Sequence, residues 1–400
     1  MPEQDDRVAS LFLVPLMQGL VGLVLFIALL NRQRDLAVLA FLVLGVFAGA
    51  RAWSRLGLSS VHCDAAVDKA KVFPGEGLVL DVRAENAKFL PVWLQMVVPV
   101  EGALKSSTEQ TTLTAACALL WHQGVSFRWE LTALKRGVHR VGPPRMRVGD
   151  LLGFYPKERQ EEETLSVVVY PKLVPIRPLS LPKREFFGMP GARSPVQDPV
   201  YLLGARDYQH NRPARYIHWK ASARHNRLQE KVFEPSVQEK VLFLVDAHGF
   251  DGESGRESFE RLLEATASLA VRMDRQGFAL GLATNGLLTG RGSGVVPVAR
   301  GPRQLPAVLE MLARLKPIAS GEMTLVLNRG VNLPWGLTCV HFAREKGDQT
   351  RVLETFFRRR HIPAVFFVSQ TDRGEAGENH SGSGTVYALD DLRVDGGKRS

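Results

Sequence analysis

The sequence has little cysteine and none of the short motifs that mark the common enzyme classes. Its 400 residues include three cysteines, Cys63, Cys117 and Cys339, which lie far apart and form no C-x-x-C pair. This spacing gives no zinc site and no even-numbered disulfide framework, as is typical of a reducing compartment. The chain also lacks G-x-x-x-x-G-K-[ST], H-E-x-x-H, G-x-S-x-G and a G-x-G-x-x-G that opens a helix after a strand. We therefore predict no catalytic residue and no cofactor.

Neither apolar nor charged residues are scarce. Hydrophobic residues make up 45% of the chain and charged residues 23%, which is ordinary for globular proteins and sufficient for real cores. The charge is unequal, with 51 Lys and Arg against 41 Asp and Glu, a formal +10. A basic excess suits nucleic acid, an anionic membrane surface or an acidic partner, and does not choose among them.

Long hydrophobic runs are confined to the N-terminus. The run from Ala9 to Leu30 carries no charge, and at about 1.5 Å rise per residue it spans a hydrocarbon core of about 30 Å. A second run, Leu36 to Ala50, reaches that length if the helix continues through Trp53 at the headgroups. A cleavable signal peptide is disfavoured because the chain starts acidic and no small-residue cleavage site follows the first run. Residues 1–58 are thus predicted to be a two-helix membrane anchor in contact with lipid.

The arginines around the two runs favour one orientation. The loop between the runs carries Arg32 and Arg34, whereas the other side carries Arg7, Arg51 and Arg55. The positive-inside rule then places both termini in the cytoplasm. We expect a protein of the inner cell membrane with cytoplasmic soluble domains.

Alternation of apolar and polar residues dominates the region after the anchor. The stretches 80–85 and 127–132 alternate strictly, and Gly- and Pro-containing turns separate further short apolar runs. Short alternating strands with turn signals between them predict an immunoglobulin-like β-sandwich over residues 59–180.

After Lys240 the apolar residues come in continuous runs. We expect strands at 241–245, 278–283, 323–327, 338–342 and 363–368, and helices at 257–275, 305–315 and 348–360. Apolar strands that alternate with helices predict an α/β domain with a doubly wound parallel sheet over residues 241–400. The Gly-, Ser- and Glu-rich stretch 371–385 is expected to be a flexible loop.

Residues 181–240 join the two predicted domains and are rich in basic and aromatic side chains. Between residues 201 and 240, eight Lys and Arg against four Asp and Glu leave +4 of the net +10. Two stretches stand out, G-A-R-D-Y at 204–208 and R-Y-I-H-W-K-A-S-A-R at 215–224, followed by a short strand that ends in an acidic residue.

These stretches resemble the hallmark of the domain of unknown function 58 family, G-x-R-x-Y followed by R-x-I-x-W-K-x-S-A-R. The matching positions are Gly204, Arg206, Tyr208, Arg215, Ile217, Trp219, Lys220, Ser222, Ala223, Arg224 and Glu234. The order of anchor, β-sandwich, signature and α/β domain is also similar to that of the family, so the resemblance covers nearly the whole chain. It implies a bacterial membrane protein with a von Willebrand factor A-like domain. It also implies MoxR-type AAA+ ATPases and transglutaminase-like membrane proteins as partners.

The metal motif of von Willebrand A domains is altered in this chain. Residues 246–250 read D-A-H-G-F where the motif is D-x-S-x-S, so the aspartate stays and both serines are lost. Without the hydroxyl oxygens that a hard cation prefers, we predict a degenerate site at Asp246, His248 and Phe250 that holds no metal. Asp246 is then a helix-capping or loop carboxylate. Metal binding with Asp251 or Glu253 as substitute ligands is the alternative.

The signature segment has two main interpretations. As a structural junction it would satisfy its charges internally, pairing Arg206, Arg215 and Arg224 with Asp207, Glu230 and Glu234. Trp219 would then be largely buried where the segment meets the sheet. As a docking surface it would use Arg and Trp side chains to anchor a partner. Nucleic-acid binding is disfavoured, because no known reader motif accompanies the interleaved arginines and aromatics.

These inferences combine into one expected function. The sequence predicts a non-catalytic, membrane-tethered scaffold or adaptor that presents protein-binding surfaces. The alternative is a metal-dependent or nucleic-acid-processing enzyme at the membrane. A second carboxylate or hydroxyl cluster facing Asp246 in the folded sheet would favour that alternative. The candidate partner-binding residues are Gly204, Arg206, Tyr208, Arg215, Trp219, Lys220, Ser222, Arg224 and Glu234.

Overall fold

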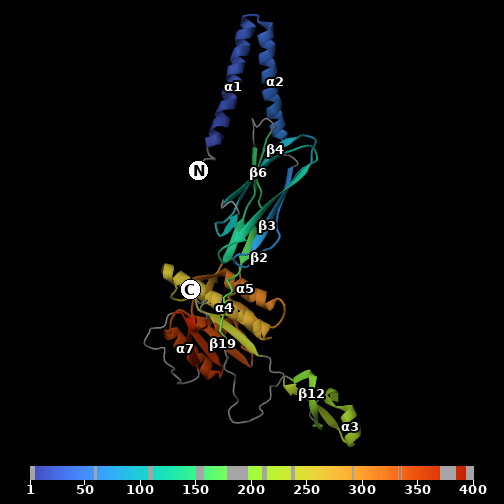
Figure 1. Cartoon of the computed structure of the whole chain (residues 1–400), viewed down its shortest axis with the longest axis vertical. Coiled ribbons are helices and arrows are strands. Elements are labelled where there is room, and N and C mark those ends of the chain that lie inside the picture. Colours follow the sequence, from blue (N-terminus) through green and yellow to red (C-terminus); the bar gives the residue numbers. More distant parts are fainter. Residues whose placement is uncertain are drawn as a thin grey trace, which may run out of the picture. The chain divides into compact units, whose positions relative to one another are not determined.

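The chain forms two compact units, Met1–Tyr170 and Pro171–Ser400, which are shown in Figure 1 as a computed structural model. The structure describes residues 5–57, 61–106, 111–149, 157–177, 197–209, 214–235, 239–290, 292–331, 333–334, 336–369 and 384–392. The division falls after Tyr170, and the segment that follows it bonds to the second unit. The Val174 N–H donates to Ser268 Oγ at 2.9 Å, and the Arg177 N–H donates to the Leu392 carbonyl at 2.8 Å.

A helical hairpin opens the first unit. Helix α1 (Asp5–Leu30) turns at Arg32, which adopts a left-handed φ of 53°, into α2 (Arg34–Gly57). Large apolar side chains stand exposed on both helices, among them Leu23, Phe26, Leu39 and Phe41. The segment Arg34–Trp53, with a mean hydropathy of 2.0, is long and apolar enough to cross a membrane, and Pro15–Leu30 is a shorter apolar stretch of the described residues. The predicted helices are confirmed, and one of them has the length and composition of a span.

The rest of the first unit is built from short strands. Two of its sheets are antiparallel and four-stranded. The strand order of the first is β1 (Val61–Val67), β3 (Gly77–Asn86), β7 (Gly124–Ala133), β5 (Leu104–Ser106). The order of the second is β10 (Lys157–Gln160), β9 (Arg145–Gly149), β4 (Val92–Pro99), β6 (Thr112–Leu119). A third sheet has β2 (Lys71–Val72), β11 (Leu165–Val169) and β8 (Gly137–Val141). One hydrophobic core takes side chains from all three sheets. The predicted alternation is confirmed in β3, where Leu80, Val82 and Ala84 are buried and Arg83 and Glu85 are exposed.

The second unit contains a six-stranded, mostly parallel sheet. Its order is β17 (Val295–Ala299), β15 (Ala279–Thr284), β14 (Lys240–Val245), β19 (Leu337–Ala343), β20 (Ala364–Val368), β21 (Gly384–Ala388), and only β17 is antiparallel to its neighbour. The helices that accompany this sheet are α4 (Gly252–Arg275), α5 (Gln304–Arg314), α6 (Met323–Gly330), α7 (Asp348–Arg359) and α8 (Leu389–Leu392). A two-stranded sheet joins β16 (Gly286–Leu288) to β18 (Leu315–Ala319). The prediction of apolar strands alternating with helices is confirmed.

Two expectations for this unit need comment. The strand predicted at 323–327 is wrong, because these residues begin α6. Met323 and Leu327 are buried and Leu325 between them is exposed, which is the i, i+4 spacing of a helix and not the alternation of a strand. The flexible loop predicted at 371–385 lies mostly outside the described residues, and its last two residues, 384 and 385, begin β21.

Candidate functional site

The signature residues fold into a small module of their own, which we call the signature module (residues 197–235). Strands β12 (Gln197–Asp207) and β13 (Gln229–Pro235) pair antiparallel, with Arg206 opposite Glu230. The connection between them contains the 3-10 helix η1 (Ala214–Tyr216) and α3 (Trp219–His225). Figure 1 labels β12 and α3 of this module.

An ion pair lies inside the module. Glu230 is fully buried, and its Oε1 accepts a hydrogen bond from Nε of Arg206, whose own side chain is partly exposed. Asp207 pairs instead with Arg227, at 3.1 Å and in a largely exposed position. The sequence prediction that Arg206 pairs within the segment is therefore confirmed, with Glu230 as the partner. A buried carboxylate needs such a partner, because an unpaired buried charge is costly.

Helix α3 is fixed by local hydrogen bonds at both ends. His218 Nδ1 accepts from the Ala221 N–H at 3.1 Å, which caps the N-terminus. Ser222 Oγ donates to the His218 carbonyl at 3.1 Å and accepts the Gln229 N–H at 2.8 Å, so it ties the helix to the start of β13. Asn226 ends the helix in the left-handed region, with φ 51°. These bonds hold a helix too short to be stable by itself.

Trp219 is exposed, and the prediction that it is buried is wrong. Its side chain is 68% exposed at the first position of α3. The physical reason is the size of the helix, which buries none of its residues and turns only Ala221 and Ser222 partly inward. Lys220 and Arg224 are also exposed on α3. The module therefore presents an indole and two cations to its surroundings, and we call these three residues the α3 face.

The other signature residues have less distinct positions. Gly204 lies exposed in β12 with open space where a Cβ would stand, so no close contact requires glycine there. Tyr208 is half-buried, and its backbone N–H donates to the Leu228 carbonyl at 2.9 Å. Arg215 belongs to η1 and Glu234 to β13, and their side chains lie outside the described part of the chain.

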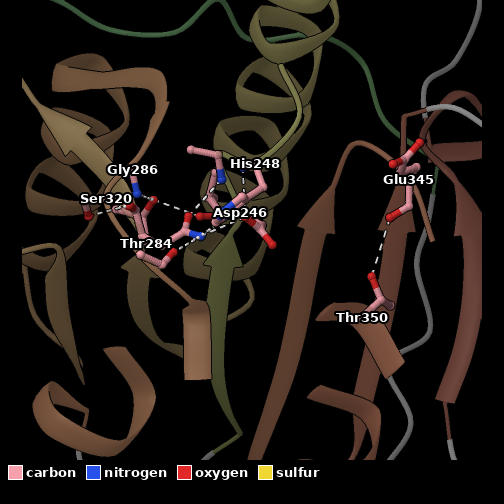
Figure 2. Close-up of polar contacts among 11 residues, drawn as sticks. Asp246, His248, Thr284, Gly286, Ser320, Glu345 and Thr350 are labelled. Atoms are coloured by element: carbon pink, nitrogen blue, oxygen red, sulfur yellow. Dashed lines mark hydrogen bonds and ion pairs between the residues drawn. The ribbon is translucent and has the colours of Figure 1, made fainter. Parts of the chain in front are cut away.

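The second candidate site surrounds Asp246, which follows β14 at the carboxyl end of the parallel sheet. Its Oδ1 accepts from Asn285 Nδ2 at 2.8 Å and from the His248 N–H at 2.9 Å, and His248 Nδ1 lies 3.2 Å from the same oxygen. Asn285 Oδ1 in turn accepts the Ala247 N–H at 2.9 Å. Figure 2 shows this network joining the ends of two neighbouring strands. The carboxylate thus crosslinks the loops that follow β14 and β15.

Two hydroxyl groups near Asp246 are engaged with backbone groups. Thr284 Oγ1 donates to the Val245 carbonyl at 2.8 Å and accepts the Gly286 N–H at 3.0 Å, while Ser320 Oγ donates to the Asn285 carbonyl at 2.7 Å (Figure 2). Within the described ranges no three His, Cys, Asp or Glu side chains gather where a metal could bind. The arrangement stabilises the two loops, because the Asn285 amide and the His248 N–H both donate to the Asp246 carboxylate.

His248 and Phe250, which stand where the von Willebrand A metal motif has serines, make other contacts. Phe250 is buried and packs edge-on against Phe259 of α4, with ring centroids 5.0 Å apart. His248 is partly exposed, and its ring Nδ1 lies 3.2 Å from Asp246 Oδ1 and 3.0 Å from Asn285 Nδ2. Asp251 is the N-cap residue of α4, without a side-chain hydrogen bond to the helix, and Glu253 lies in the first turn. Residue 250 is therefore an aromatic residue of the core.

A buried histidine lies close to the same end of the sheet. His341 on β19 is 1% exposed, and neither ring nitrogen has a hydrogen-bond partner among the described residues. Burial lowers its pKa from 6.5 to about 4, although the negative charge of Asp246 acts in the opposite direction. The ring packs edge-on against Phe366 at 5.5 Å. The neutral imidazole is therefore the folded form at neutral pH.

Asn285, Ser320 and His341 were not predicted from the sequence as residues of this site. Asn285 directly follows a predicted strand, and residues that follow parallel strands meet at one edge of a sheet, so its position was a usable signal. His341 stands alone in an apolar strand and carries a similar signal. Ser320 follows β18, a strand that the sequence analysis did not expect, and offered no signal.

Comparison with known proteins gives one curated relative and many distant structural likenesses. The chain is 26% identical to the uncharacterized protein YeaD of Bacillus subtilis (strain 168) over 281 residues, which cover 68% of this chain and 67% of the relative. A type II cohesin domain of Acetivibrio cellulolyticus is 11% identical, covers 27% of this chain and 95% of its own, and has a TM-score of 0.22. The cupredoxin domain of amoB from Nitrosocaldus yellowstonii is 11% identical, with 28% and 89% covered and a TM-score of 0.19. Likenesses this distant carry no argument about fold or function.

A family model matches the region in which the signature lies. Residues 204–329 match the family described as "Protein of unknown function DUF58", and this stretch begins at Gly204, the first residue of the signature. The match runs through β13, β14 and α4 and beyond Asn285. The family match and the relative YeaD together support the DUF58 family for this chain.

Proposed function

We propose that this chain is a non-catalytic, membrane-tethered scaffold or adaptor whose α3 face docks an acidic surface of a partner protein. The observation that carries the proposal is the exposure of Trp219 on a helix that hydrogen bonds hold in place. Water solvates an exposed indole poorly, and Trp and Arg are the residue types that most often dominate binding energy at interfaces. Structural need does not explain the indole, because it fills no core.

The charge of the α3 face indicates the chemistry of the partner. Lys220 and Arg224 lie one helical turn apart and are both exposed. Complementary charge steers association and selects against wrong partners, so an acidic surface fits best. The resemblance to the DUF58 family suggests a MoxR-type AAA+ ATPase, or a transglutaminase-like membrane protein, as that partner.

The remaining parts have supporting roles in the proposal. The hairpin of α1 and α2 would anchor the chain in the inner cell membrane with its soluble units in the cytoplasm. The three sheets of the first unit would be an immunoglobulin-like sandwich. The six-stranded sheet with one antiparallel edge strand would be a von Willebrand factor A-like domain without a metal. This last assignment is supported by the bonds that the hydroxyls near Asp246 make to backbone groups.

Comparative affinity purification tests the proposal. The tagged full-length chain is purified from membranes as wild type, as Trp219→Ala, and as Val352→Ala, a control at an exposed apolar residue of α7. Truncation of a binding hot spot costs about 2 kcal/mol or more, so recovery of the specific partner should fall by about tenfold or more with Trp219→Ala alone. Equal recovery with all three chains would overturn the proposal.

A further inference from the structure

Three large apolar side chains stand exposed at one end of the β unit. Phe89 is 80% exposed, Trp121 57% and Leu120 48%. Phe89 lies in the loop between β3 and β4, and the other two lie in the loop between β6 and β7. We call the segments 87–91 and 120–123 the tip loops. Large exposed apolar groups that gather in one place mark an interaction surface.

The ladder pairing shows that both loops lie at the same end of their sheets. Val92, the first residue of β4, pairs with Leu119, the last residue of β6. Glu85, next to the end of β3, pairs with Gly124, the first residue of β7. Each tip loop therefore crosses from one sheet to the other at this end.

Buried hydrogen bonds hold the tip loops in place. The Asn86 side chain is fully buried, and its Nδ2 donates to the Leu90 carbonyl at 2.9 Å and to the Leu120 carbonyl at 2.8 Å. The His122 N–H donates to the Lys88 carbonyl at 3.2 Å, and the His122 ring meets the Phe89 ring edge-on at 4.7 Å. The two loops thus form one braced platform. Its large apolar side chains stand exposed on this bonded backbone.

The platform is bonded to the end of the apolar helix. Trp53 closes the segment Arg34–Trp53 that is long enough to cross a membrane. Its Nε1 donates to the carbonyl of Pro91, the last residue of the first tip loop, at 2.8 Å. If α2 spans a bilayer, Trp53 and the loop bonded to it lie at the level of the headgroups.

We infer that the tip loops insert Phe89, Leu120 and Trp121 into the interfacial layer of the membrane. The inference rests on the proposed membrane tether and adds a second point of lipid contact. Trp favours the boundary between headgroups and acyl chains, where its ring is desolvated and its indole N–H stays hydrated, and Phe and Leu bury apolar surface at the same depth. The contact would fix the β unit against the bilayer.

Depth-dependent fluorescence quenching tests the inference. The full-length chain is reconstituted in phosphatidylethanolamine–phosphatidylglycerol vesicles, with and without lipids brominated on the upper acyl chain. Subtracting the emission of Trp121→Phe from that of the wild type isolates Trp121 among the six tryptophans. We expect a blue-shifted component that brominated lipid quenches. The same subtraction with Trp219→Phe, the exposed tryptophan of α3, should give a component that brominated lipid leaves unchanged.

Two results would contradict the inference, and they are distinguishable. If the Trp121 component keeps its intensity in brominated lipid and acrylamide quenches it as strongly as Trp219, the platform faces water and the inference is wrong. Shielding from both quenchers would show that protein, such as a second copy of the chain, covers the platform instead. Flotation with a carbonate wash tests the tether separately. Release of the chain from the vesicles would overturn the tether, and the inference with it.

Discussion

His341 occupies the most unusual environment among the residues described. A histidine in the middle of a parallel sheet, with both ring nitrogens unbonded in the described structure, must stay neutral to be tolerated. Asp246 contributes a compensating negative charge, but burial has the larger effect on the pKa, which is lowered to about 4. The folded and unfolded chains therefore differ in protonation at mildly acidic pH.

We predict that the free energy of unfolding falls as the pH is lowered from about 6.5 to about 4. In this window the unfolded chain binds a proton at His341 and the folded chain does not. The pKa difference between the two states corresponds to a loss of about 3 kcal/mol in the free energy of unfolding. Below about pH 4 both states are protonated, and the contribution stops changing. Denaturant unfolding of wild type and His341→Phe across this range should show a flatter profile for the variant. Parallel profiles would show that the ring is not the cause.

Asp246 provides a second test at the scale of one residue. Its carboxylate accepts two close hydrogen bonds in a buried loop, so Asp246→Asn should lower the free energy of unfolding by about 1–3 kcal/mol. Because the proposed role is structural, Mg²⁺ should leave the stability of both proteins unchanged. Asp251→Asn, at a carboxylate without a side-chain capping bond, should change stability by less than about 0.5 kcal/mol. Saturable Mg²⁺ binding that Asp246→Asn abolishes would return the metal-dependent enzyme to consideration.

At the scale of the element, the signature module contains residues that hold its fold together and residues that are exposed on its surface. Arg206 bonds to the buried Glu230 carboxylate, and Ser222 links α3 to the start of β13. The Trp219 side chain, by contrast, is exposed. Each of the two interpretations of the signature therefore holds for part of it. Its arginine is internally satisfied and its tryptophan is not buried.

We predict that only one of two substitutions in the signature module changes its amide hydrogen exchange. Arg206→Ala removes the guanidinium that bonds the buried Glu230 carboxylate, so amide hydrogen exchange across β12 and β13 should become faster by a factor that corresponds to about 2–4 kcal/mol. Trp219→Ala should leave the exchange rates of the module nearly unchanged. Adding Glu230→Gln to Arg206→Ala should restore part of the protection. Fast exchange in Trp219→Ala would show that the indole supports the fold.

Helices and strands could be predicted from the sequence where the hydrophobic period and the length of a run indicated the same element. The predictions were wrong where burial depends on tertiary context. Continuous apolar strands such as 241–245 are unambiguous because both faces of a central strand are covered. The run 323–327 is too short for its period to be read, and only the packing of Met323 and Leu327 makes it helical. Trp219 alternates with the apolar residues Ile217, Ala221 and Ala223 in the sequence, but nothing in the sequence reveals that α3 ends after two turns and buries none of its residues.

The site was predicted in part for similar reasons. Asp246 was identified from its position after a strand, but its partners Asn285 and Ser320 come from segments that only the fold brings together. The Arg206–Glu230 pair was predictable because opposite charges in one short segment tend to pair. The tip loops were not predicted, since exposure of Phe89 and Trp121 depends on how two sheets close around one core.

At the scale of the whole molecule, the proposal depends on which side of the membrane holds the soluble units. A cytoplasmic location would bring a chain of net charge +10 to the anionic inner leaflet. We predict that a C-terminal reporter active only in the periplasm stays silent. The same reporter fused after Gln33, between α1 and α2, should be active. The reverse pattern would place the soluble units outside the cytoplasm and exclude an ATPase of the cytosol as the partner.

Site-directed photo-crosslinking in living cells tests the central claim most directly. A photoreactive residue replaces Lys220 on the α3 face, and the control replaces Val352 on α7. We expect one discrete adduct from position 220, none of the same mass from position 352, and loss of the adduct when Arg224→Glu reverses the charge of the α3 face. No adduct from position 220, or an adduct that Arg224→Glu leaves unchanged, would contradict the claim that this face docks an acidic partner.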